Sequence, residues 1–200
     1  MTQAMDEAAL ELELSDDDVL EAMREIPGYI DIFVDDFREI YHLAHRHAVR
    51  RATAHLRAGA MMRRGVPALA ADSMLDTAAR AIAASGYKGL PVVDADGVVV
   101  GMLTETDFLR RLGAASLLEL LLELMADGSG LRHRCHETPV SAAMTAPATT
   151  VAEDAGFGAM LKAFDACGGR SLPVVDARGR LSGLLLRKDF LSAAHLERLL

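Results

Sequence analysis

LPVVDADG, residues 90–97, returns 82 residues later as LPVVDARG, residues 172–179. Each copy is a Pro-led run of β-branched residues followed by a turn that ends in Gly, which predicts a strand entering a hairpin. The same offset relates further pairs, namely Met62 with Met144, Asp72 with Asp154, Gly86 with Gly168, Gly101 with Gly183 and Asp107 with Asp189. The chain therefore contains two copies of one supersecondary unit, each too small to bury its apolar face alone.

The residues around each copy predict the order strand, helix, strand, strand, helix. An Ala-rich stretch opens at Asp72-Ser73 and stops at Gly86, as a capped helix does. After the hairpin turn, the strand VVVGML leads into the helix TETDFLRRLG. The helix AEDAGFGAMLKAFDACGG of the second copy is predicted to be poorer, because it contains Gly156 and Gly158.

Composition and charge place the chain among globular proteins with an acidic N-terminal segment. Its 200 residues are 51% hydrophobic and 25% charged. Residues 1–40 hold 13 of the 29 acidic side chains and two of the 21 Lys and Arg, so the rest of the chain is mildly basic. An overall charge of −8 argues against non-specific binding to nucleic acid.

The cysteine count and the apolar runs bear on the compartment. Two cysteines, Cys135 and Cys167, are too few for a disulfide framework. The acidic N-terminus resembles no signal or transit peptide. The longest apolar run, LLELLLELM, is short and interrupted by Glu, so it predicts no membrane span. We therefore expect a cytoplasmic protein with no membrane partner.

The residues outside the repeats are predicted to form helices. Ser15 and the three acids after it resemble a helix start, Pro27-Gly28 breaks that helix, and a long helix is predicted from near Asp35 to about Met62. The linker between the copies begins with SLLELLLEL, which is too apolar for a lone surface helix. We expect this helix to be buried against a partner chain or against the N-terminal helices.

The chain resembles a pair of CBS domains, which together form a Bateman module. The resemblance rests on the order of an extended segment, a helix, G-x-x-x-LPVVD, a turn and then GMLTETDFL, most of which is repeated in register. The resemblance implies an α+β fold of two tandem β-α-β-β-α repeats packed pseudo-symmetrically, preceded by an α-helical N-terminal segment. The expected divisions are residues 1–60 for the N-terminal helices, 61–114 and 142–200 for the two CBS domains, and 115–141 for a helical linker.

In this family, two clefts between the repeats commonly hold adenosine compounds: AMP, ADP, ATP or S-adenosylmethionine. The resemblance implies that the aspartate of T-x-x-D accepts hydrogen bonds from the ribose hydroxyls, and that each cleft combines residues of both repeats. Site A would contain Met102, Thr104, Thr106, Asp107, Thr149, Thr150, Arg170, Ser171 and Pro173. Site B would contain Leu184, Arg187, Lys188, Asp189, Pro67, Ala68, Tyr87, Lys88 and Pro91. Arg170 and Lys88 would each face a phosphate, or be exposed loop cations without a role.

The motif also has a reading without any ligand. Thr104 followed by Asp107 is an ordinary capping box for the helix that starts there. The second copy reads GLLLRKDF, in which Leu186 has no oxygen to cap with, yet Asp189 is retained. We therefore favour site A as the occupied cleft, because its hydroxyl is intact, and leave site B empty or suited to a more highly phosphorylated ligand.

Nothing in the sequence proposes catalysis, so the chain is not expected to be an enzyme. The RHRCHE stretch around Cys135 has metal-ligand character but no partnering motif, so no metal site is expected. The resulting hypothesis is a homodimeric regulatory module that binds adenine nucleotides (AMP, ADP or ATP), requires no cofactor and signals to an unknown downstream protein. The alternatives are a constitutive dimerisation scaffold with empty clefts, a sensor of S-adenosylmethionine or an NAD-type ligand and, least favoured, a nucleic-acid binder.

Overall fold

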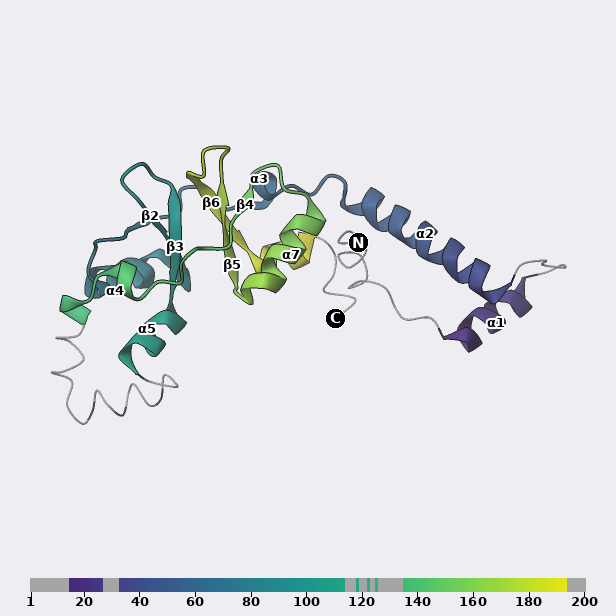
Figure 1. The fold of residues 1–200 in the computed structure, drawn as a ribbon, viewed down its shortest axis with the longest axis horizontal. Helices are drawn as coiled ribbons and strands as arrows, with labels where there is room; N and C mark the ends of the chain where they lie inside the picture. The colour runs from purple at the N-terminus through teal and green to yellow at the C-terminus, as the bar shows by residue number, and fades with distance from the viewer. Residues whose placement is uncertain are drawn as a thin grey trace.

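The computed structural model describes residues 15–26, 33–113, 118, 122, 125 and 135–193. It contains two repeats with the same order of strands and helices, which confirms the predicted α+β fold (Figure 1). The first repeat runs β1 (Leu69–Ala70), α4 (Leu75–Ser85), β2 (Gly89–Val93), β3 (Val99–Thr104) and α5 (Glu105–Leu112). The second runs β4 (Val151–Ala152), α7 (Phe157–Cys167), β5 (Ser171–Val175), β6 (Leu181–Leu186) and α8 (Arg187–Ala193).

Each repeat has one three-stranded sheet in which the middle strand pairs with both neighbours. β2 pairs parallel with β1 and antiparallel with β3, and β5 does the same with β4 and β6. The two hairpins turn in the same way: Asp94 Oδ1 accepts the N–H of Val98 at 2.9 Å, and Asp176 Oδ1 accepts that of Arg180 at 2.9 Å. The backbone N–H of Arg180 lowers the pKa of Asp176. The quoted octapeptides therefore fold as predicted, as a strand and its turn.

Each sheet packs its helices on an apolar core. In the first repeat, Leu75 and Ile82 of α4 are buried with Leu90 and Leu103 of the hairpin. In the second, the ring of Phe190 of α8 stacks on that of Phe157 and packs at a tilt against that of Phe164, both of α7, with centroid distances of 5.2 and 5.5 Å. Burial of these two phenylalanines explains why α7 spans 11 residues, as α4 does, despite its glycines.

The opening turn of each repeat docks on the other repeat. The short helix α3 (Ala58–Met61) precedes the first repeat, yet the N–H groups of Ala58 and Gly59 donate to carbonyls of the second, at 3.0 and 2.8 Å. The 3₁₀ turn η2 (Val140–Ala142) precedes the second repeat and donates to Ser73 and Ala71 of the first in the same way, at 2.8 and 2.9 Å. The segment that leads into each repeat therefore completes the fold of the other repeat.

Backbone hydrogen bonds join the repeats at two equivalent places. Arg63 exchanges two hydrogen bonds with Leu184 of β6, and Thr145 exchanges two with Met102 of β3, all between 2.9 and 3.0 Å. Gly101 lies where the first repeat meets the chain entering the second: a Cβ built there would stand 2.4 Å from Met144 Sδ. The repeated glycine therefore allows the close approach of the two repeats.

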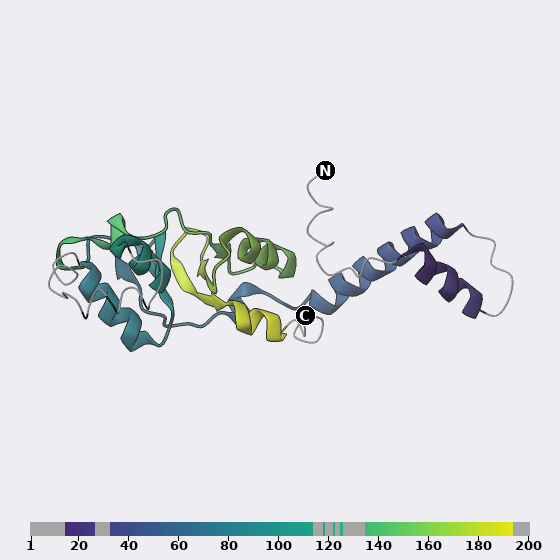
Figure 2. The same ribbon diagram turned by 90° about the horizontal axis from the view of Figure 1, so that it is seen from below.

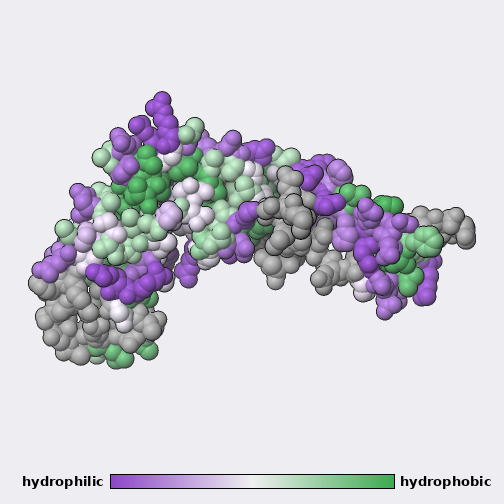
Figure 3. Space-filling view, in the orientation of Figure 1, coloured by the Kyte–Doolittle hydropathy of each residue, from purple (hydrophilic) through white to green (hydrophobic). Residues whose placement is uncertain are grey.

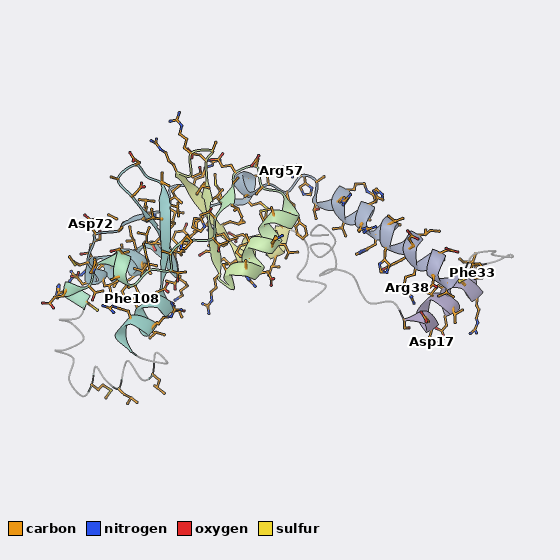
Figure 4. All side chains as sticks on the ribbon, viewed as in Figure 1. Asp17, Phe33, Arg38, Arg57, Asp72 and Phe108 are labelled. Atoms are coloured by element: carbon orange, nitrogen blue, oxygen red, sulfur yellow. The ribbon has the colours of Figure 1, made fainter. Side chains whose placement is uncertain are left out.

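The N-terminal helices form an arm that projects from the repeats (Figures 1 and 2). α1 (Asp16–Glu25) folds back on α2 (Val34–Thr53), and Arg38 of α2 forms ion pairs with Asp16 and Asp35. Figure 4 shows Arg38 beside α1, at the end of the arm remote from Arg57. None of the residues of α2 is buried, and Figure 3 shows apolar surface interspersed with polar surface along the arm.

The prediction of one helix from Asp35 to about Met62 is wrong, because α2 ends at Thr53. Leu56 is 5% exposed and Ala58 is fully buried, and both belong to the core of the second repeat. A continuing helix would carry these residues away from that core, so burial overrides local helical propensity. The chain instead leaves the helix, and Arg57 forms a bridge with Gly156.

The linker helix predicted from SLLELLLEL lies largely outside the described residues. Leu118, Leu122 and Met125 are described and helical, and they are 69%, 61% and 84% exposed in the single chain. Their burial against a partner chain stays a prediction. In the part of the chain that the structure describes, no helix combines the length and the apolar character needed to cross a bilayer.

Candidate functional site

A cavity of about 410 Å³ lies between the two repeats. The first repeat contributes the end of β3 and the start of α5, where Asp107 lies, and the second contributes the end of α7 and the start of β5. These are the ends at which each hairpin strand meets a helix, so backbone polar groups and helix termini gather there. The fold thus creates a polar cleft with walls from both copies of the repeat.

The structure brings eight of the nine residues predicted for site A to this cavity. They are Met102, Thr104, Thr106, Asp107, Thr149, Arg170, Ser171 and Pro173. Thr150, the ninth, precedes β4 and does not line the cavity. The sequence reasoning missed several lining residues, namely Glu105, Leu109, Arg110, Thr145, Cys167, Gly168, Gly169 and Leu172, and it assigned Lys88 to the other cleft.

Asp107 is the central polar group of the cavity, and its side chain is 2% exposed. Its Oδ2 accepts the backbone N–H and the hydroxyl of Thr104, at 2.8 and 2.7 Å. Its Oδ1 accepts the Thr145 hydroxyl at 3.0 Å and Arg110 Nη1 at 3.1 Å. Thr145 belongs to the segment that enters the second repeat, so this carboxylate ties the two repeats together.

Thr104 and Asp107 therefore form the helix-capping box that the sequence predicts for the first repeat. Thr104 Oγ1 accepts the N–H of Asp107 at 3.3 Å, while the aspartate bonds back to the N–H of Thr104, which is a complete capping box. A carboxylate has about four acceptor positions, and here all four are used by protein donors. Oδ2 is committed to the capping box with Thr104, whereas the donors to Oδ1, Thr145 and Arg110, lie outside that box and line the cavity, so Oδ1 is the oxygen at which a ligand can exchange with the protein.

Cations surround the mouth of the cavity. Lys88 pairs with Glu105 at 2.9 Å. The equivalent positions of the second repeat are Arg170 and Arg187, so the pair of opposite charges becomes a pair of like charges. Arg187 turns away and donates to the carbonyls of Gly169 and Phe164 at the end of α7. Arg170 is exposed, and among the described residues its guanidinium forms no ion pair.

The residues predicted for site B are not gathered in the same way. A second cavity, of about 480 Å³, is lined by Tyr87, Lys88, Arg187 and Lys188 together with Leu186 and Leu191, and it meets the first cavity at Lys88, Arg170 and Ser171. The other members of the predicted site do not line it. These are Pro67, Ala68, Pro91, Leu184 and Asp189. Asp189 is instead paired with Arg63.

The metal-type residues of the linker make ordinary contacts where they are described. His136 Nδ1 lies 3.2 Å from Asp76 Oδ2, and Cys135 is half-buried beside α4 and α5. His133 lies outside the described residues.

Two intertwined β-α-β-β-α repeats with polar clefts at their junction define a tandem-repeat module. The sequence pattern of the CBS domain matches residues 58–114 and 140–196, together more than half of the chain. The chain therefore belongs to the CBS domain family and contains a pair of these domains. No curated protein sequence matched the chain.

Solved structures of CBS proteins share this fold. The CBS domain of a CBS domain-containing membrane protein from Sphaerobacter thermophilus is 27% identical, with a TM-score of 0.60, and the match covers 77% of this chain and 97% of that one. CBSX2 of Arabidopsis thaliana in complex with AMP is 24% identical, with a TM-score of 0.53, over 71% and 98%. MJ1225 of Methanocaldococcus jannaschii, described as an archaeal homologue of g-AMPK, is 25% identical, with a TM-score of 0.55, over 68% and 46%.

Proposed function

We propose that this protein is a regulatory module that binds an adenine nucleotide in the cleft of Asp107 and catalyses no reaction. The observation that carries the proposal is a cavity built from both repeats, with a buried carboxylate at one side and, at its mouth, Arg170, which forms no ion pair with any residue that the structure describes. The volume of about 410 Å³ lies within the range of small-molecule sites. AMP, ADP and ATP are the proposed ligands, with S-adenosylmethionine and NAD-type compounds as the alternative within the same ligand class.

The sugar would bind at Oδ1 of Asp107. A vicinal diol presents two O–H donors, and these can replace the donors that Thr145 and Arg110 now supply. Exchanging one hydrogen-bond donor for another changes the free energy little, so the buried carboxylate remains satisfied throughout. Arg110 is 70% exposed, which makes its contact the easier one to give up.

The phosphate end would lie at the cationic mouth. Three cations line the cavity, Lys88, Arg110 and Arg170, against the two carboxylates of Glu105 and Asp107. The surplus positive charge is carried by Arg170, whose planar guanidinium can bind a phosphate through two parallel hydrogen bonds. The base would contact the apolar wall of Met102, Leu172 and Pro173.

The choice of ligand class is supported by the family and by CBSX2, which holds AMP on the same fold. Signalling would be a shift between two arrangements of the repeats, and it requires that the nucleotide bind one arrangement more tightly. We propose that the chain acts as a homodimer and that the N-terminal arm carries the signal to a downstream protein. The arm suits that role because none of its α2 residues is buried against the repeats.

One observation favours the scaffold alternative. Asp107 already has four protein donors, so it needs no ligand to be stable where it is. In that reading the carboxylate holds the repeats together and the clefts stay empty. Binding measurements separate the two functions, since a scaffold gains no stability from any nucleotide.

The test is thermal unfolding with adenosine, AMP, ADP, ATP, NADH and S-adenosylmethionine, followed by calorimetric titration of the best ligand. A nucleotide at about 100 times its Kd stabilises the folded state by about 2.7 kcal/mol. Arg170→Ala should weaken AMP and ATP but leave adenosine unchanged, whereas Arg178→Ala, an exposed arginine in the hairpin turn at the opposite end of β5, should alter none of them. No stabilisation by any of these compounds at millimolar concentration rejects the proposal and leaves the scaffold.

A further inference from the structure

The two clefts carry different donors to their aspartates, at positions that the repeat offset relates. Thr145 enters the first cleft and Arg63 enters the second, each held by two backbone hydrogen bonds to the last strand of the opposite repeat. Each side chain then donates to the aspartate of its own cleft, Thr145 to Asp107 and Arg63 to Asp189. Threonine supplies one small donor, whereas arginine fills the position with a long cationic side chain.

Arg63 grips Asp189 with both arms of its guanidinium. Its Nε lies 2.9 Å from Oδ2 and its Nη2 lies 3.2 Å from Oδ1, so both carboxylate oxygens accept from one side chain. The hydrogen bond and the charge of Asp189 raise the pKa of Arg63, so the guanidinium stays protonated. A vicinal diol also binds a carboxylate through two donors, so Arg63 occupies on both oxygens of Asp189 the acceptor positions that a sugar would need.

The other residues of the second cleft also disfavour a sugar beside Asp189. The cavity on that side reaches Leu186 and Lys188 but touches neither Asp189 nor Arg63. Leu186 stands where the first repeat has Thr104, so a sugar reaching this cleft would lose a hydroxyl partner as well. The first cavity, in contrast, includes Asp107, Thr104 and Thr145.

We infer that Arg63 is a tethered occupant of the second cleft, which excludes sugar from Asp189 so that each chain binds one nucleotide, in the cleft of Asp107. This inference rests on the proposed function, because it concerns the same ligand class. Arg63 is then a specificity-determining residue, which makes two similar clefts unequal. Both partners are partly exposed, at 48% and 29%, so displacement of Arg63 is costly but possible. We expect the pair to weaken nucleotide binding in the second cleft by about fivefold, in addition to the loss caused by Leu186. Together the two differences should place that cleft outside the concentration range in which the first cleft is titrated.

The experiment is calorimetric titration of the full chain with AMP and, separately, with ATP. The wild type should bind one equivalent. Arg63→Thr copies the residue at position 145 and should add a second, weaker event, which Arg63→Thr/Leu186→Thr should tighten further by restoring the hydroxyl. Asp189→Asn in the Arg63→Thr background should abolish that second event. Arg64→Thr is the matched control, since it removes the neighbouring charge without touching Asp189, and it should keep one equivalent.

The outcomes separate the inference from the proposed function. Two equivalents of equal affinity for the wild type, or one equivalent for both Arg63→Thr and the double variant, overturns the inference while leaving the proposed function intact. No binding by the wild type but binding by Arg63→Thr upholds the tethered occupant and rejects the first cleft as a nucleotide site. No binding by any variant overturns both, provided that circular dichroism shows each variant to be folded.

Discussion

The same residue type at the start of the last helix is held by different chemistry in the two repeats. Asp107 is enclosed by hydroxyl and backbone donors and by the exposed Arg110, whereas Asp189 is held by a single arginine fork. A sugar at Asp107 displaces one neutral hydroxyl and one exposed arginine that holds a single carboxylate oxygen. A sugar at Asp189 must instead break an ion pair in which one arginine occupies both carboxylate oxygens, which is the physical origin of the inequality between the clefts.

The capping box at Thr104 gives a stability prediction that is independent of any ligand. Thr104→Ala removes the side-chain oxygen that accepts the N–H of Asp107 and also one donor to the buried carboxylate. We expect the free energy of unfolding to fall by about 1 to 2 kcal/mol. Urea unfolding measures this change. Thr106→Ala, in the same turn but exposed and without a side-chain hydrogen bond among the described residues, should stay within about 0.5 kcal/mol of the wild type.

At the residue scale, the sequence predicted which side chains gather at the first cleft but not which atoms they use. The resemblance placed Asp107 opposite Thr149 and Arg170, and the structure brings all three to one cavity. It did not indicate Arg63, because the two copies differ there: the offset pairs Arg63 with Thr145, and no shared letter marks the position. Thr145 and Arg63 immediately follow the aligned Met144 and Met62, and that adjacency was the available signal.

At the scale of the element, the glycines of the repeats have different structural roles. Gly158 lies in the first turn of α7 with nothing within 4 Å of an added Cβ, so it costs helix stability and allows no close contact. Gly183 lies in β6, where an added Cβ would stand 2.6 Å from the carbonyl oxygen of Arg63 and 2.7 Å from Met62 Sδ. One glycine is dispensable and the other is required by the contact between repeats.

Alanine substitutions should therefore have opposite signs at these two positions. Gly158→Ala should raise the free energy of unfolding by about 0.5 to 1 kcal/mol, because alanine is the better helix former. Gly183→Ala should lower it by about 1 to 3 kcal/mol, because backbone must move to make room. Chemical unfolding of both variants beside the wild type measures the two shifts. A loss of stability in Gly158→Ala would show that α7 is closely packed on that side, contrary to the open space around Gly158.

The helices and strands that the sequence predicts correctly are those whose boundaries are set by residues close to them in the chain. The hairpins follow from the Gly-ended turns, and α5 ends where Gly113 adopts a positive φ of 79°. The end of α2 depends on a distant cause: Leu56 is drawn into the core of the second repeat, a contact across about a hundred residues. Neither helical periodicity nor propensity carries that information, so the prediction overran the true end.

At the scale of the whole molecule, the repeats are interlocked rather than adjacent. Residues that precede the first repeat complete the core of the second, where Leu56, Ala58 and Met62 are buried. Residues that precede the second complete the first, where Val140 is fully buried. A contact of this kind makes the pair one cooperative unit, because neither core is finished by its own repeat alone.

This interlock predicts a sharp boundary in N-terminal truncations. A chain of residues 55–200 loses α1 and α2 but keeps Leu56, Ala58 and Met62, so its free energy of unfolding should lie within about 1 kcal/mol of the full chain. A chain of residues 65–200 still contains both β-α-β-β-α units but lacks these three side chains and the backbone bonds of Arg63 to β6. Loss of several buried groups should cost it well over 3 kcal/mol, and we expect little cooperative unfolding.

A point variant tests the same claim without shortening the chain. Leu56→Ala should lower the free energy of unfolding by about 2 to 5 kcal/mol, because a side chain that is 5% exposed leaves a void in the second repeat. Leu43→Ala on the arm, where the side chain is 42% exposed, should cost much less and serves as the control. If Leu56→Ala and the chain of residues 65–200 both unfold as the wild type does, then each repeat is complete by itself. The two clefts would then have to be explained as a contact between independent domains, since a shared core could no longer fix their walls.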